Sequence, residues 1–295
     1  EVVGDLPKTD TLGYRWNAFN NLFWETADVA AGEWTASKSD NEANAEKEQL
    51  QFKWAKPYKP DAEATVNISA AAIMARTTPI QRGWIPSGTL YLTAGLDLGM
   101  YWNHWVLLAF KDGATPHVVD YGTFEVRSPI VGVERATAIA LQEFRDVCEH
   151  GWLTSDKTMR SPDRVFIDSG YQSQEVYRFV RQFGAGRYWA ADGQGTARDN
   201  GSGSYHAPSK VGGDVLLIGE NYHVKQLSTG MVVQADSNEW KTWAHKRLVT
   251  PIGQPGAMTL FSGEGNTHAE FAKHLTSEQQ VDEFIPLKGI KTIWT

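Results

Sequence analysis

From residue 89 onward, the apolar residues recur with the period of a β-strand in some segments and with that of an α-helix in others. This pattern predicts the fold. Three runs of strand length follow one another and are separated only by short turns. The connection between the first two is short enough for an antiparallel hairpin. These strands are expected over TLYLTAGLD (89–97), WNHWVLLAFK (102–111) and HVVDYGTFEV (117–126).

The period then changes to that of amphipathic helices. One helix is expected over Val133–His150, where the apolar residues on one face are Val133, Ala136, Ile139, Ala140, Val147 and Cys148. A second helical stripe contains Val176, Phe179, Val180 and Phe183. A fourth strand, PDRVFIDSGY (162–171), lies between the helices, and a fifth, RYWAADG (187–193), follows them.

The resulting order, β-β-β-α-β-α-β, is that of the α/β ribonuclease H-like fold. This fold has a mixed sheet of strand order 3-2-1-4-5 flanked by helices, so the first strand would lie beside the fourth. Helical crossovers make such neighbours parallel. Residues 1–87 differ in pattern, with an aromatic-rich helical stretch and a proline-containing connector, and are interpreted as an N-terminal helical linker region. Residues 88–295 are predicted to form the α/β domain.

Two aspartates are the main candidates for chemistry, because each ends an apolar strand. Asp97 closes the first predicted strand and Asp168 the fourth, and each is followed two residues later by glycine. Parallel neighbouring strands lie about 4.8 Å apart, so both acids would emerge at the same edge of the sheet. Their mutual repulsion would favour a bound cation. Two Mg²⁺ or Mn²⁺ ions suit oxygen ligands and in-line phosphodiester cleavage.

Another class of protein shares this core. GLDLG is similar to the phosphate-binding turn of actin-like and sugar-kinase ATPases, and IDSG would be its second copy. The two aspartates are only 71 residues apart, and no second meander of three strands precedes Asp168. The chain also lacks a P-loop motif. We therefore expect two strands of one sheet rather than two duplicated domains.

The charge, cysteine content and hydrophobicity of the chain further limit the kinds of protein it could be. The formal net charge is -7, which argues weakly against a general nucleic-acid binder but leaves local patches open. Cys148 is the single cysteine and is expected to be a buried spacer. No apolar run reaches the length of a membrane span, so no membrane partner is expected.

Several other residues are candidates for DNA or metal binding. The Gly- and Ser-rich segment 191–210 is either a flexible surface loop or a mobile loop that runs along bound DNA. In the second case, Arg198 and Lys210 would contact the DNA phosphates. In DSNEWKTWAHKRL, a capping box would start a helix with Trp240, Trp243 and Ala244 inward. Its outer basic face would hold Lys241, His245, Lys246 and Arg247. Asp192 and Asp236 are candidate extra metal ligands, and Asp120 is a candidate turn acid. The segment THAE (267–270) is predicted to start another helix. His104 lies near Asp97 but is expected to be an ordinary strand histidine.

The chain resembles the nuclease domain of the large terminase subunit of tailed bacteriophages, in its lambda-like branch. The resemblance rests on LTAGLDLG, HVVDYGTF, RVFIDSGYQSQEVYRFVR with RYWAADG, and HAEFAKHLTSEQQVDEF. It runs from about Leu92 to the C-terminus. The N-terminal GYRWNAFNNLFWETADVA is similar to the tail of the family's motor region and its linker.

The resemblance implies a metal-dependent endonuclease that cuts concatemeric double-stranded viral DNA. Asp97 and Asp168 match the family's acids on strands one and four. A third acid is expected shortly after the segment matching IKTIWT, and Asp236, Glu239, Asp282 and Glu283 are candidate substitutes. Implied partners are viral DNA, the small terminase subunit and the portal or procapsid, in the host cytoplasm. An actin-like ATPase and a non-catalytic DNA or portal docking module are the alternatives.

Overall fold

The computed structural model describes residues 16–36, 48–56, 68–183, 186–195, 205–278, 280–285 and 289–294. They belong to two compact units, Glu1–Thr65 and Val66–Thr295. The first unit contains the 3-10 helix η1 (Ala18–Asn20), the helix α1 (Thr26–Ala36) and the π-helix η2 (Gln49–Lys53). Asn17 caps η1 because its side chain accepts a hydrogen bond from the Phe19 amide. The helical period predicted for this region is thus present in α1.

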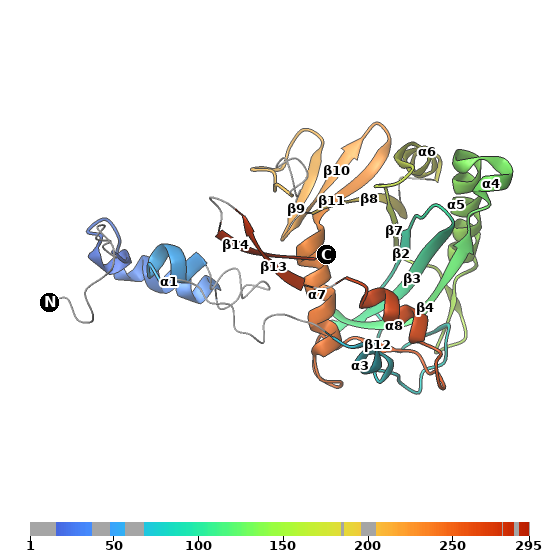
Figure 1. Cartoon of the computed structure of the whole chain (residues 1–295), viewed down its shortest axis with the longest axis horizontal. Helices are drawn as coiled ribbons and strands as arrows, with labels where there is room; N and C mark the ends of the chain where they lie inside the picture. The colour runs from blue at the N-terminus through green and yellow to red at the C-terminus, as the bar shows by residue number, and fades with distance from the viewer. Residues whose placement is uncertain are drawn as a thin grey trace. The chain divides into compact units, whose positions relative to one another are not determined.

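The second unit is built on a large mixed sheet (Figure 1). Within the described residues its order is β12-β4-β3-β2-β7-β8-β11-β10-β9. The pairs β2–β7, β7–β8, β8–β11 and β4–β12 are parallel, and the others are antiparallel. The strands are β2 (Tyr91–Asp97), β3 (Trp102–Lys111), β4 (Thr115–Glu125), β7 (Arg164–Asp168), β8 (Tyr188–Gln194), β9 (Val215–Gly219), β10 (Tyr222–Leu227), β11 (Gly230–Asp236) and β12 (Thr259–Leu260).

The five predicted strands form the middle of this sheet. They correspond to β2, β3, β4, β7 and β8, and they lie in the order β4-β3-β2-β7-β8. The predicted hairpin is the antiparallel pair β2–β3, and the predicted parallel neighbours are β2 and β7. The expected mixed sheet flanked by helices is therefore confirmed. The extensions β9–β11 and β12 at the two edges were not predicted.

Helices α5 (Val133–His150) and α6 (Ser173–Phe183) cover one face of the sheet. Alternate residues of β2 point toward them, since Leu92, Ala94 and Leu96 are buried in the same core as Phe144. Cys148 is buried there as predicted, and burial raises the pKa of its thiol to about 12. Ile139 was predicted to face inward, but it is 45% exposed.

A second core lies on the other face of the sheet, against α3 (Ala70–Met74), α7 (Ser237–Val249) and α8 (Ala269–Leu275). Figure 1 shows α7 and α8 on the side of the sheet away from α5. Ile73 of α3 is fully buried in this core with Leu248 of α7. Residues 68–87, predicted to belong to the linker region, thus pack within the Val66–Thr295 unit. The functional division at residue 87 stays a prediction.

Shorter elements complete the second unit. A small sheet contains β1 (Trp84–Ile85), β5 (Trp152–Thr154) and β6 (Met159–Arg160), and α4 spans Ser128–Val131. The hairpin of β13 (Gln280–Ile285) and β14 (Gly289–Trp294) forms a separate two-stranded sheet. Within the described part of the chain, no helix is both long and apolar enough to cross a bilayer.

Candidate active site

The carboxylates of Asp97 and Asp168 lie at the ends of adjacent parallel strands. Leu96 of β2 is paired with Ile167 of β7, so the next residue on each strand is an aspartate. Leu96 and Ile167 point into the core beneath α5 and α6, and the following residues point to the opposite face. The structure therefore brings the two predicted site residues together at one edge and on one face of the sheet.

The two turns after these aspartates use their glycines in different ways. A Cβ at Gly99 would collide with the carbonyl oxygen of Trp102, so this glycine permits the tight turn between β2 and β3. The Gly170 amide donates to Oδ1 of Asp168 at 3.3 Å, which holds the carboxylate at the end of β7. Gly99 is thus explained by the tight turn.

The environment of Asp168 disfavours its charged form. Burial raises the pKa of Asp168 above its usual value, and the nearby charges of Asp97 and Asp192 raise it further. The amide of Gly170 acts in the opposite direction but does not cancel the rise. A half-buried carboxylate beside two other acids is stabilised by a cation, as expected for a metal ligand.

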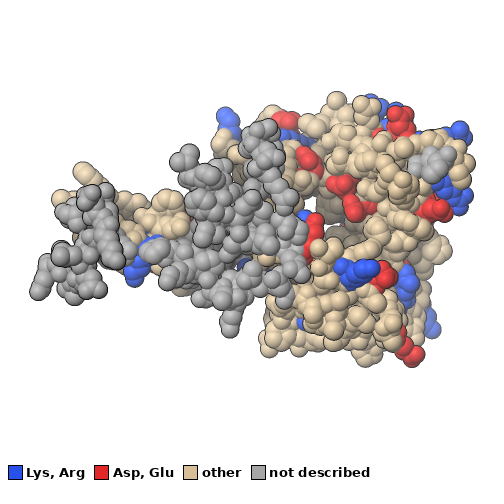
Figure 2. Space-filling model, in the orientation of Figure 1, with Lys and Arg blue, Asp and Glu red and all other residues tan. Residues whose placement is uncertain are grey.

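A cavity of about 450 Å³ opens beside the two aspartates. Its floor comes from β2, β3, β4 and β7, and its far wall comes from α8. Its polar lining residues include Asp97, His104, Asp168, Glu270 and His274, whereas much of the remaining lining is apolar. Figure 2 shows a hollow in this face of the unit with acidic side chains gathered around it. The volume lies in the range of small-molecule binding pockets.

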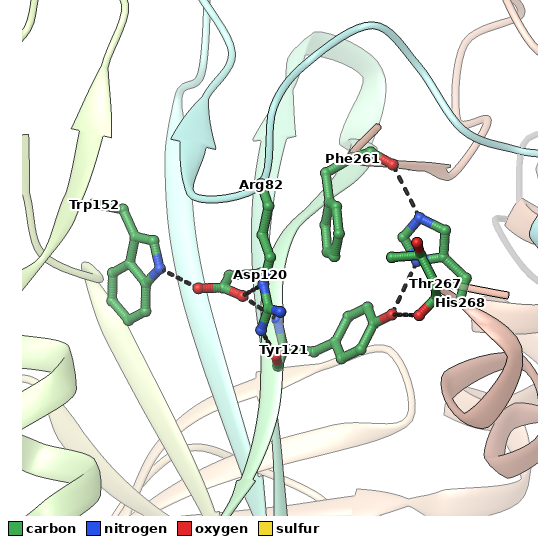
Figure 3. A network of polar contacts seen from close by, with 7 residues as sticks. All are labelled: Arg82, Asp120, Tyr121, Trp152, Phe261, Thr267 and His268. Carbon is green, nitrogen blue, oxygen red and sulfur yellow. Dashed lines mark hydrogen bonds and ion pairs between the residues drawn. The ribbon is translucent and has the colours of Figure 1, made fainter. Parts of the chain in front are cut away.

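Tyr121 of β4 anchors α8 as the wall of this cavity. Its ring stacks on Phe271 of α8, with centroids 4.4 Å apart and planes inclined by 10°. Its hydroxyl lies 3.0 Å from the carbonyl oxygen of Thr267 and 2.9 Å from Nδ1 of His268. Nε2 of His268 in turn donates to the carbonyl oxygen of Phe261 at 3.0 Å (Figure 3). The segment before α8 is therefore fixed to the sheet by contacts that involve neither His104 nor His274.

Asp120 belongs to the same network and is not a turn acid, which corrects the prediction. It lies within β4, where it accepts hydrogen bonds from Nε of Arg82 at 2.7 Å and Nε1 of Trp152 at 2.9 Å (Figure 3). The pairing of β3 with β4 shifts by one residue between Leu107 and Leu108. This bulge occurs beside Asp120, since Leu107 pairs with Asp120 and Leu108 with Val118.

Two histidines meet in the cavity. His104 of β3 is paired with Asp97 across the β2–β3 ladder. Its ring makes an edge-to-face contact with His274 of α8, with centroids 4.6 Å apart. Burial lowers the pKa of His104, His274 lowers it further, and Asp97 acts in the opposite direction. His104 therefore faces the candidate site.

The other candidate acids occupy different positions. Asp192 of β8 follows Ala191, the partner of Asp168, so its side chain starts on the opposite face of the sheet. It accepts hydrogen bonds from Nε2 of Gln234 at 2.7 Å and of Gln194 at 3.2 Å. Asp236 is the N-cap of α7, since it accepts from the amides of Asn238 and Glu239. Asp282 and Glu283 lie on β13, paired with Thr292 and Lys291.

The predicted arrangement of α7 is wrong in part. His245, predicted on the outer basic face, is buried and packs against Trp294 of β14 at a centroid distance of 4.3 Å. Trp240, predicted inward, is 39% exposed. The hairpin β13–β14 explains this difference, because it covers a side of α7 that the sequence pattern assigned to solvent.

The predicted DNA-binding residues that the structure describes do not line the cavity. Lys241 is paired with Glu278 at 2.5 Å, and the Arg247 guanidinium lies 3.4 Å from the ring centroid of Trp243. Lys246 is on the same helix, and Lys210 is exposed near the start of the β9–β11 region. Arg198 lies outside the described residues.

The candidate metal donors at the site are the two carboxylates of Asp97 and Asp168. Among the residues that the structure describes, no three His, Cys, Asp or Glu side chains form a group that could hold a metal ion. Magnesium is often held by one or two carboxylates together with waters and substrate phosphates. Asp97 and Asp168 fit that mode for one ion.

Sequence reasoning missed the contribution of α8. THAE indicated a helix start, and α8 does begin at Ala269, but no local pattern shows that Glu270 and His274 reach the cavity. Their position depends on contacts with β4, which is distant in sequence.

Comparison with solved structures finds only slight likeness. An exopolyphosphatase from Cytophaga hutchinsonii is 12% identical, with a TM-score of 0.24 over 35% of this chain and 34% of that one. A Ppx/GppA family member from Aquifex aeolicus is also 12% identical, with a TM-score of 0.23 and 35% of each chain covered. The chain thus spans about a third of the length of these proteins, and the likeness supports no functional argument. No curated protein matches it.

A protein-family comparison gives a far more extensive match. The model described as "Terminase large subunit gpA, endonuclease domain" matches residues 11–284. This range includes both aspartates, the strands that carry them and the α8 wall. The chain therefore belongs to the family of the endonuclease domain of the terminase large subunit gpA.

Proposed function

We propose that this protein is a divalent-metal-dependent endonuclease of the ribonuclease H-like class, in the lambda-like branch of the terminases. The observation that carries the proposal is the register of β2 and β7, which places Asp97 beside Asp168 at a cavity. The order β4-β3-β2-β7-β8 supports the ribonuclease H-like assignment. The substrate is concatemeric double-stranded viral DNA.

Asp97 and Asp168 would hold Mg²⁺ or Mn²⁺, and two ions are proposed in the complete site. Bound ions of this kind polarise the phosphate and activate a water. The protein's own part is to orient the two carboxylates, and the Gly170 amide does this for Asp168. Asp192 is the proposed additional acid because β8 pairs with β7 beside Asp168. Its side chain starts on the other face of the sheet and would have to turn around the strand end to reach the metal. Asp236 is a weaker candidate because it caps α7.

Partners follow from the family's role in DNA packaging. We propose that the chain acts with the small terminase subunit and the portal or procapsid, in the host cytoplasm during virus assembly. Arg198, Lys210, Lys241, Lys246 and Arg247 are proposed to contact phosphates outside the cavity. Such contacts are largely independent of sequence, so a partner would supply the choice of cleavage site.

The decisive experiment is plasmid nicking with Mn²⁺, with and without EDTA, for the wild type, Asp97→Asn and Asp168→Asn. Each substitution removes a proposed metal ligand. We expect at least a roughly 100-fold loss of rate, since even the outer partners of metal ligands cost 10–100-fold when mutated. Asp146→Asn is the matched control, because Asp146 is an exposed acid on α5 and should leave the rate unchanged.

Other outcomes would favour the alternatives. Metal-dependent cleavage that persists in Asp97→Asn would overturn the assignment. Thermal stabilisation by a nucleotide without DNA cleavage would favour an actin-like ATPase. DNA packaging that is unchanged by both substitutions would favour a docking module.

A further inference from the structure

The pair formed by His104 and His274 differs from the buried histidines of the same unit. His117, His223 and His268 each use a ring nitrogen in a hydrogen bond with another residue. Among the described residues, neither His104 nor His274 makes a side-chain hydrogen bond or an ion pair, and their recorded contact is with each other's rings. Both line the cavity that contains Asp97 and Asp168. Their ring nitrogens are therefore available to a ligand there.

The position of the pair fits a phosphate better than a metal ion. His104 lies directly opposite Asp97 in the β2–β3 ladder. Among the described residues, however, neither histidine belongs to a group of three His, Cys, Asp or Glu side chains that could hold a metal ion. A phosphodiester that approaches two carboxylates meets like charge, so it requires hydrogen-bond donors on the facing side. Imidazole N–H groups are such donors, and α8 supplies the facing wall.

The pair is not needed to hold α8 in place. Stacking of Tyr121 on Phe271 and the hydrogen bonds of His268 already fix this helix and the segment before it. His274 is exposed on α8, and its side chain is free to serve a substrate. Loss of the His274 ring should therefore leave the fold intact.

We propose that His104 and His274 together donate hydrogen bonds to a non-bridging oxygen of the phosphodiester that is cut, and so hold it against Asp97 and Asp168. The proposal rests on the proposed nuclease function and adds the residues that position its substrate. The ligand class is a nucleic-acid phosphodiester. No proton transfer is assigned to either ring.

Binding is tested by NMR of the full chain labelled with ¹⁵N-histidine, in EDTA so that no cleavage occurs. A short DNA duplex is added, and inorganic phosphate is added in a separate sample. We expect the ring nitrogens of His104 and His274 to shift with both, and those of exposed His150 to stay unchanged. No shift at the pair, or an equal shift at His150, would overturn the proposal.

Positioning is tested by His274→Gln and His104→Gln in single-turnover nicking with Mn²⁺. We expect each rate to fall by roughly 10–100-fold, because small misplacements of a reacting group cost up to about 10²-fold. The Kd for the duplex should change less than about 2-fold, since most affinity comes from other phosphate contacts. His150→Gln is the matched control and should behave as the wild type.

Melting temperatures separate this role from a structural one. Unchanged melting with a reduced rate supports positioning, whereas a rate that falls only together with melting and duplex affinity overturns it. His104→Asn provides a second variant if His104→Gln folds poorly. Wild-type cleavage by His274→Gln, with inactive Asp97→Asn, would reject this inference alone. Active Asp97→Asn with shifted histidine signals would reject the metal assignment but leave phosphate binding by the pair intact.

Discussion

Asp168 shows at the residue scale how a site can cost stability. Its carboxylate is half-buried at the end of β7, with Asp97 and Asp192 nearby, and its pKa is raised by burial and by those charges. In the folded state it therefore keeps its proton to a higher pH than in the unfolded chain. The unfolding free energy falls as pH rises from the unfolded value of about 3.9 through the folded pKa. At neutral pH the charged carboxylate destabilises the apo protein.

Asp168→Asn should therefore raise the melting temperature of the metal-free protein at pH 7. The gain should shrink as pH falls toward the unfolded pKa, because wild-type Asp168 is then protonated and neutral. Thermal melts in EDTA at several pH values measure this, with the exposed Asp146→Asn as control. A variant that melts at or below the wild-type temperature at pH 7 would show that the carboxylate is not under electrostatic strain.

Sequence reasoning could find Asp97 and Asp168 because each ends an apolar run, a signal contained within a few residues. It could not place His274 at the cavity, because α8 is brought there by contacts of Tyr121 and Phe271. It also could not show that His104 lines the cavity, since a histidine on a strand has no local feature that shows what its ring faces. Residues whose positions are fixed by the end of a strand were predictable. Residues whose positions depend on packing between distant segments were not.

At the scale of elements, α5 shows how far helical periodicity is reliable. Its bounds, Val133–His150, were predicted correctly, and Ala136, Ala140 and Cys148 are buried as expected. The buried stripe also includes Thr137, Leu141 and Phe144, which moves its centre away from Ile139. Sequence spacing thus gave the helix but misplaced one edge of its buried face.

Phe144→Ala should destabilise the protein by about 3–5 kcal/mol, the usual cost of truncating a buried phenylalanine. Phe144 is fully buried and its ring packs near those of Trp105 and Phe124. Ile139→Ala, on the same helix but 45% exposed, should change stability by no more than about 0.5 kcal/mol. Urea unfolding of the two variants measures the difference, and equal losses would contradict the assigned core face.

At the scale of the whole molecule, stability should depend on several histidines buried in neutral form. Burial and, to a smaller extent, the nearby charge of Lys111 lower the pKa of His117 to about 4. The pKa values of His104, His223 and His268 are also lowered, with burial as the main cause. A histidine with a depressed folded pKa binds protons more readily in the unfolded chain, so stability is lost as pH falls below about 6.5.

The wild type should lose on the order of 3 kcal/mol through His117 between pH 6.5 and pH 4. His117→Gln should remove much of this pH dependence, while the exposed His150→Gln should retain it. Urea midpoints across this pH range provide the measurement. Parallel pH profiles for His117→Gln and the wild type would rule out His117 as a source.

The two compact units suggest a further test at this scale. Residues 66–295 contain both hydrophobic cores and every residue that lines the cavity. Expressed alone, they should fold with a melting temperature within a few degrees of the full chain and retain Mn²⁺-dependent nicking. Circular dichroism and the plasmid assay measure both properties. An unfolded or inactive fragment would show that residues 1–65 contribute to the fold or to the site.

The sequence predicted the central strands of the sheet but not its edges. Strands β2, β3, β4, β7 and β8 have clear apolar runs, and helical crossovers fix the directions of the last two. In contrast, β12 has two residues, and β9 carries exposed leucines at Leu216 and Leu217. Short or solvent-facing strands lack the alternation that marks a half-buried sheet, so their pairing depends on the rest of the fold.

The pairing of β2 with β7 also has a consequence for how the protein is made. Asp97 leaves the ribosome 71 residues before Asp168, and at roughly 5–20 residues per second this interval lasts several seconds. During that time β2 has no parallel neighbour to complete the carboxylate pair. The two carboxylates proposed to hold the metal therefore cannot lie side by side until β7 has emerged and docked against β2.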